Sequence, residues 1–256
     1  MGISINTNLA TLSVARKTAD SYSNLYMSME KLTSGLKINR ASDDPAGLVI
    51  SEQFRAQIGS LNQEIENTSH LINKYETASS TVGEMRSQLT ELRGLAVSAA
   101  SEGFNDDTSQ AALAQAGEYI VDNYNHTADS AVYNGTNMLD GSEGAPADVS
   151  KLENVDLSSA EAAEASIAVI DDAIAELDSV QIELGATQKY DLESRRSSLE
   201  ITAQNLQAAE SLHRDADYAL EVATMVGEMI KVQSSLALMS HTRIQANSVL
   251  RMLGTK

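Results

Sequence analysis

The stretch YALEVATMVGEMIKVQSSLALM, residues 218–239, decides the fold. Its large apolar residues recur at alternating intervals of four and three, the heptad spacing of a helix that packs along one face. The residues of this predicted seam are Tyr218, Val222, Met225, Met229, Val232, Leu236 and Met239. The spacing predicts a one-sided helix that needs a partner, because burying each such side chain is worth roughly 1.5 to 3 kcal/mol.

The N-terminal end of the chain repeats this pattern. Its predicted seam consists of Leu12, Ala15, Ala19, Tyr22, Tyr26 and Met29, with Leu36 close to the same register. A third seam runs from Leu61 to Val82 and predicts a helix over residues 46–101, about 80 Å long at 1.5 Å per residue. We therefore expect helices at both ends and a long helical rod between them.

Composition supports a helical fold. The 256 residues are 42% hydrophobic but include only 8 Tyr, 2 Phe and no Trp, so a core depends on Ala, Leu, Ile, Val and Met. The two prolines, Pro45 and Pro146, leave long stretches free for helices. Asn134-Gly135 and Asp140-Gly141 are hairpin turn signals. The sequence predicts an all-α, elongated helical bundle or coiled coil with a small β-hairpin region at about 132–150.

A break in the helical pattern lies at residues 39–47, NRASDDPAG. Asp44 is expected to cap the helix that follows, with Pro45 in its first position. A second turn is expected at residues 102–107, again followed by a helical pattern.

Charge divides the chain along similar lines. Residues 1–44 and 212–256 each carry a formal charge of +1, whereas residues 45–211 carry −20, which gives the net charge of −18. Near-neutral apolar helices can be crowded together, whereas strongly acidic segments repel one another. We therefore predict an inner terminal coiled-coil domain from 1–44 with 212–256, and an outer helical rod domain from 45–211.

The seams admit two interpretations. They can pair with each other inside a monomeric bundle, or they can be buried mainly in an assembly of many copies. Spacing by itself does not separate these alternatives.

The stretch SGLKINRASDDPAGL, residues 34–48, resembles the signature segment of bacterial flagellins, the subunits of the flagellar filament. Further segments resemble the same family in the same order: LTELRGLAV (89–97), YNGT (133–136), LDG (139–141), LGATQ (184–188) and RDADYA (214–219). Together they cover nearly the whole chain, which is similar to a short member that lacks additional outer domains.

The resemblance implies paired end helices that line a tube, and a structural subunit that self-assembles into the helical filament for motility. The implied partners are other copies of the chain, junction and cap proteins, an export chaperone and the type III export apparatus. It also implies an extracellular filament, secreted without a cleaved signal peptide. The start of the chain lacks the features of a secretory signal, and no apolar run approaches the ~18 residues that cross a bilayer. The alternatives are a hook-filament junction protein, or a secreted monomeric coiled-coil effector or adhesin.

A receptor-like surface is implied at Glu91, Arg93 and Leu95. In family members that stimulate host receptors, a basic residue stands at the position of Glu91, whereas Arg93 and Leu95 match. We therefore expect weak or absent receptor recognition.

The sequence offers no catalytic constellation. It contains no Cys, its four His are scattered without metal-ligand spacing, and its glycines form no phosphate-binding loop. The strongly negative charge argues against nucleic-acid and anionic-membrane binding. We expect a non-enzyme with no cofactor and no metal.

Overall fold

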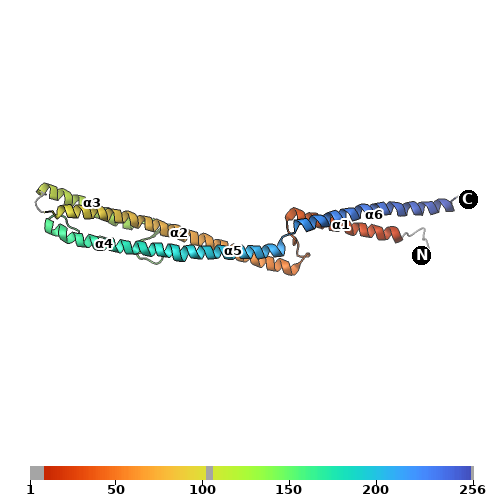
Figure 1. Ribbon diagram of the computed structural model, residues 1–256, viewed down its shortest axis with the longest axis horizontal. Coiled ribbons are helices and arrows are strands. Elements are labelled where there is room, and N and C mark those ends of the chain that lie inside the picture. The colour runs from red at the N-terminus through yellow and green to blue at the C-terminus, as the bar shows by residue number, and fades with distance from the viewer. Residues whose placement is uncertain (1–8, 102–105, 255–256) are drawn as a thin grey trace. The chain divides into compact units, whose positions relative to one another are not determined.

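A computed structural model describes residues 9–101 and 106–254. The elements in chain order are α1 (Leu9–Ser34), α2 (Pro45–Ala99), α3 (Asp107–Ser130), β1 (Val132–Tyr133), β2 (Thr136–Asn137), α4 (Ala160–Ala186), the π-helical turn η1 (Thr187–Leu192), α5 (Glu193–Arg214) and α6 (Tyr218–Leu253). Figure 1 labels the helices of this order. The prediction of an all-α fold with a small β-hairpin is confirmed.

The helix ends follow the local chemistry expected from the sequence. Asp44 caps α2, since its carboxylate accepts hydrogen bonds from the backbone N–H groups of Ala46 and Gly47 at 3.1 and 2.9 Å. Asp106 caps α3 through the N–H of Ser109 at 2.8 Å. Asn134 and Gly135 both have positive φ, 50° and 81°, as a tight two-residue hairpin turn requires. Part of the predicted turn, residues 102–105, lies outside the described residues.

The described residues form two compact units. We call residues up to Gly59 together with those from Ala203 the terminal unit, and Ser60–Thr202 the central unit. This division by packing lies inside α2 and α5, whereas the sequence prediction divided the chain after 44, just before α2, and after 211, within the last turn of α5. The two divisions differ because a helix can run on without interruption while its packing partner changes.

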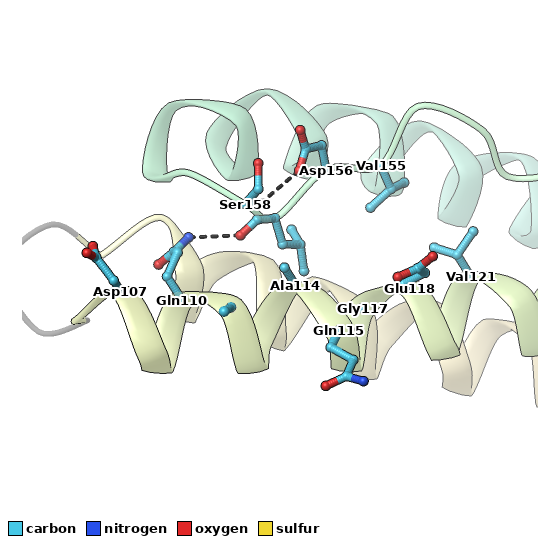
Figure 2. A pocket seen from close by; sticks show the side chains of 12 residues that line it. Asp107, Gln110, Ala114, Gln115, Gly117, Glu118, Val121, Val155, Asp156 and Ser158 are labelled. Carbon is cyan, nitrogen blue, oxygen red and sulfur yellow. Dashed lines mark hydrogen bonds between the residues drawn. The ribbon is translucent and has the colours of Figure 1, made fainter.

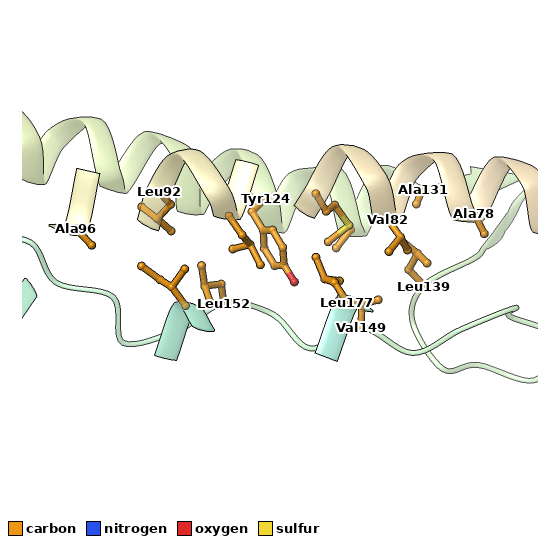
Figure 3. Packing of buried hydrophobic residues seen from close by; sticks show 14 of the residues in the cluster. Ala78, Val82, Leu92, Ala96, Tyr124, Ala131, Leu139, Val149, Leu152 and Leu177 are labelled. Atoms are coloured by element: carbon orange, nitrogen blue, oxygen red, sulfur yellow. The ribbon is translucent and has the colours of Figure 1, made fainter. Parts of the chain in front are cut away.

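The central unit has a continuous apolar core. α2 contributes a buried row to it, and α3 and α4 cover that row with apolar residues of their own (Figure 3). Fully buried members from α2 include Val82, Met85, Leu89 and Leu92. The third predicted seam leads into this row, with Ile72 and Val82 both buried. The buried apolar side chains of this unit are therefore packed together as in the core of a globular domain.

Tyr124 of α3 is the largest side chain in this core. Its hydroxyl donates a hydrogen bond to the carbonyl oxygen of Ser150 at 3.3 Å, and burial raises its pKa to about 12. The adjacent Asn125 exchanges two hydrogen bonds with the backbone of Leu152, at 2.9 and 3.1 Å. These contacts tie the irregular segment before α4 to α3, and so hold the core closed.

Candidate assembly interface

In the terminal unit α1 packs along α6 (Figure 1). The two helices are antiparallel, because Thr11 near the start of α1 bonds to Thr242 near the end of α6, at 3.2 Å between hydroxyl oxygens. α1 buries a row of residues spaced by three and four, which we call its covered row: Thr11, Val14, Thr18, Ser21, Leu25, Ser28 and Leu32, all buried or half-buried. This row is rich in hydroxyl groups.

The seam predicted for α1 is not the row that faces α6. Its large members, Leu12, Tyr22, Tyr26 and Met29, are all exposed, and Tyr26 is 68% exposed. They form an exposed row that lies one residue, or about 100° around the helix, from the covered row. Of the two interpretations left open by the spacing, pairing of the large seam residues of α1 within one chain does not occur among the described residues, since α1 packs on α6 through the neighbouring row.

The seam predicted for α6 is divided between two faces. α6 covers Glu221, Met225, Glu228, Val232, Ser235, Met239 and Thr242, again with heptad spacing. Of the predicted residues, Val232 is buried, Val222, Met225 and Met239 are half-buried, and Tyr218, Met229 and Leu236 are exposed. Further apolar side chains are exposed on other faces of α6, at Leu220, Val226, Ile230, Leu238 and Ile244. α6 is thus not the one-sided helix that the spacing predicted.

Glu228 is the one charged side chain in the buried part of this pair that the structure describes. It is 7% exposed, and its Oε1 lies 2.8 Å from Nζ of Lys231. This ion pair, with smaller contributions from Ser21 and Asn24 of α1, lowers the pKa of Glu228. Its second oxygen, Oε2, is buried as well. The pair therefore contains polar groups where a self-sufficient coiled coil has apolar ones.

Leu36 lies outside α1, contrary to its predicted place near the seam. α1 ends at Ser34 because Gly35 adopts a φ of 72°, which stops the helix. Leu36 then pairs in an antiparallel bridge with Asp215. The backbone N–H of Lys37 donates to Arg214 at 2.7 Å on one side of this bridge.

Sequence reasoning missed the side chains around this bridge. Arg214 donates from Nη1 to Oε1 of Glu52 at 2.8 Å, and the side chain of Arg214 is only 14% exposed. The rings of Phe54 and His213 lie 6.0 Å apart. No spacing signal links positions so far apart along the chain, so only the tertiary fold reveals them.

The receptor-like residues lie in the central unit. Glu91 is exposed on α2, and Leu95 packs partly against the core. Arg93 binds Asp171 of α4 with its Nε 2.5 Å from Oδ1, and this pairing raises the pKa of Arg93. One heptad earlier, Arg86 binds Asp178 at 2.5 Å. The two ion pairs align α2 and α4, and Arg93 is already engaged within its own chain.

A groove also lies in the central unit, between α3 and the segment that precedes α4 (Figure 2). Its volume is about 730 Å³. Ala111, Ala114, Val121 and Leu157 provide an apolar lining, and Asp107, Glu118 and Asp156 provide carboxylates. Gln110 holds the two walls together through a hydrogen bond from its Nε2 to the carbonyl oxygen of Leu157, at 2.9 Å. We call this the α3 groove.

Neither a metal site nor a membrane span appears in the described part of the chain. Residues 9–101 and 106–254 contain no cluster of three or more His, Asp or Glu side chains that could hold a metal ion. None of their helices combines the length and the apolarity that crossing a membrane requires. The exposed apolar residues of α1 and α6 form a candidate functional surface.

Comparison with known families identifies the class. Residues 5–144 match the bacterial flagellin N-terminal helical region, and residues 167–253 match the bacterial flagellin C-terminal helical region. The chain belongs to the bacterial flagellin family.

Individual relatives agree over nearly the full length. The chain is 33% identical to a flagellin of Halalkalibacterium halodurans, over 97% of this chain and 99% of that protein. It is 28% identical to the flagellar filament 30.7 kDa core protein of Treponema maltophilum, with the same coverage of both chains. Among solved structures, a crystal structure of Bacillus cereus flagellin covers 55% of this chain and 88% of its own, with a TM-score of 0.42 and 20% identity.

Proposed function

We propose that this chain is the structural subunit of a bacterial flagellar filament, and that its copies polymerise through the exposed apolar residues of α1 and α6. The observation that carries this proposal is the inverted distribution of side chains in the α1–α6 pair. Hydroxyl groups and a carboxylate are covered beside Leu25 and Val232, while the tyrosines and several leucines and methionines face outward. Large apolar side chains exposed in such number mark an interaction site.

Charge supports copies of the same chain as the partner. The terminal segments are close to neutral, so many of them can be packed together without strong repulsion, whereas the acidic middle is suited to a solvated exterior. α6 has apolar residues on several faces, which is typical of a helix that is buried on all sides. In this proposal residues 1–44 and 212–256 form the inner domain of the filament and residues 45–211 its outer domain.

A single charged substitution among the exposed apolar residues of α1 or α6 tests the proposal. Tyr26→Asp or Met229→Asp places a charge where a second copy is expected, so seeded polymerisation should be lost while the isolated subunit keeps its helix content. Ser23→Asp, at an exposed polar position of α1, is the matched control and should leave filament growth unchanged. Electron microscopy and sedimentation measure the yield. Filaments of normal yield from both test variants would count against the proposal.

Family membership supports further partners, which form part of the proposal. A chaperone that shields α6 before export, the type III export apparatus, and junction and cap proteins at the filament ends would each meet the exposed apolar residues or the helix ends. The filament is proposed to be extracellular and to act mechanically, without catalysis. No observation favours a junction protein or a monomeric effector over a filament subunit.

Weak receptor recognition also remains a proposal. It rests on the acidic Glu91 and on the engagement of Arg93 by Asp171. Glu91→Arg should increase signalling by the purified chain in a receptor reporter assay, and Glu84→Arg, another acid on α2, is the control. Strong signalling by the unmodified chain would refute this expectation.

A further inference from the structure

The π-helical turn η1 shifts the register of the long helix that contains it. The buried leucines of this helix, Leu177, Leu184 and Leu192, are spaced by seven and then by eight residues. A π turn adds one residue to the helical repeat, and such turns are frequent at functional sites. η1 therefore keeps the leucines on one face, and it keeps the opposite face in register as well.

The opposite face carries large apolar side chains in the open. Ile182 and Tyr190 are again eight residues apart across η1, and Tyr190 and Ile201 are eleven apart, or about three turns. All three are exposed, and Tyr190 is 75% exposed. Nζ of Lys189 lies 5.9 Å from the centre of the Tyr190 ring. We call Ile182, Lys189, Tyr190 and Ile201 the η1 ridge.

Lys189 joins none of the ion pairs found among the described residues, although the central unit is strongly acidic. A tyrosine with a neighbouring cation is suited to an acidic surface with an apolar floor, because its ring is apolar and its hydroxyl is polar. The ridge thus presents a cation outside these ion pairs next to exposed apolar side chains.

The α3 groove has the complementary chemistry. Its lining is apolar at Ala111, Ala114 and Leu157, and its charged residues are carboxylates without a base among them. Gly117 brings the walls close, since a Cβ at this position would meet Leu157 at 2.6 Å. Asp107 and Glu118 are exposed at the groove and take part in no ion pair of the described chain.

One copy cannot bring the two surfaces together. The groove adjoins the start of α4 at Ala160, and the ridge surrounds its end at Ala186. A helix of this length separates them by about 40 Å. A contact between them must join two copies through two different surfaces, and such heterologous contacts repeat without closing on a pair.

We infer that the η1 ridge of one copy docks into the α3 groove of a neighbouring copy, with Tyr190 over the apolar floor and Lys189 beside the carboxylates. This inference rests on the proposed filament function and adds a contact outside the terminal helices. Electrostatic complementarity would fix which copies meet and in which register.

A charge exchange tests the contact in the full-length chain. Lys189→Glu and Glu118→Lys should each raise the critical concentration for seeded polymerisation by about tenfold. The double variant, which restores opposite charges between copies, should recover most of the loss. Asp172→Lys, at an exposed acid of α4, is the control, and thermal unfolding establishes that each variant stays folded.

Cysteine cross-linking gives a second readout, because the chain has no cysteine of its own. Tyr190→Cys combined with Ala111→Cys should produce a ladder of disulfide-linked multimers in filaments, whereas Tyr190→Cys with Glu91→Cys should not. Normal filaments that show neither the charge effect nor the ladder would overturn this contact while the filament function stands. Failure of the unmodified chain to polymerise would overturn both.

Discussion

The central unit and the α1–α6 pair are built from the same kind of helix, with opposite use of their apolar residues. In the central unit leucines, methionines and Tyr124 point inward and are nearly all covered. In the α1–α6 pair the covered positions include Thr18, Ser21 and Glu228, and the tyrosines point outward. The central unit is therefore stabilised by burial within a single chain. The α1–α6 pair leaves most of its apolar surface for contacts with other molecules.

We expect the largest difference between the two regions when one side chain of each is truncated to Ala and the loss of unfolding free energy is compared. Leu92→Ala empties a fully buried position of the central unit and should cost about 2 to 5 kcal/mol of unfolding free energy. Leu236→Ala, in the exposed part of α6, should change it by less than about 0.5 kcal/mol. Denaturant unfolding of the isolated subunit measures both. Equal losses would mean that α6 is already covered within one chain.

A smaller effect is expected at the end of α1. Gly35 has a φ of 72° and open space around its missing Cβ, so Gly35→Ala meets only backbone strain. We expect a loss of roughly 1 to 2 kcal/mol, confined to the terminal unit. Hydrogen exchange, which resolves the two units, checks the assignment. Gly59→Ala within α2 is the control, because it has the same open surroundings without positive φ, and it should not destabilise.

Acid should weaken the α1–α6 pair through Glu228. Lys231 lowers the pKa of Glu228 in the folded chain. The ionised Glu228 therefore stabilises the fold fully above the pKa of the unfolded chain, about 4.3, and this stabilisation is lost as the pH falls through the lower pKa of the folded chain. Glu228→Gln should therefore show a smaller loss of helix content between pH 6 and about pH 3. The pKa of Glu52 is also lowered, chiefly by Arg214, so Glu52→Gln serves as the comparison for the same unit. Identical acid profiles of wild type and Glu228→Gln would contradict this role.

The smallest effect is expected from the exposed ion pairs of the central unit. Arg93→Ala removes the pair with Asp171, and pairs that are about half exposed contribute only about 0 to 1 kcal/mol. Salt should reduce this contribution further, since charges at the surface are screened. A loss comparable with that of Leu92→Ala would show that register between α2 and α4 depends on charge more than on packing.

The sequence predicted the elements well because their signals are local. The cap at Asp44, the turn at Asn134-Gly135 and the length of α2 each depend on residues within a few positions of one another. The candidate site was less predictable. Heptad spacing identified the residues of both end helices, yet it could not show that Tyr22 and Tyr26 point away from α6, because the rows on a helix are only one residue apart.

By itself the sequence determined the helical fold, the cap at Asp44, the hairpin and the separation of near-neutral ends from an acidic middle, since propensity, capping and charge act through neighbours along the chain. Only the tertiary structure decided which row of α1 meets α6, how Arg214 reaches Glu52, and where the α3 groove and the η1 ridge lie. These features depend on the close approach of backbones distant in sequence, where small side chains such as Ser21 and Gly117 allow contacts that larger ones prevent.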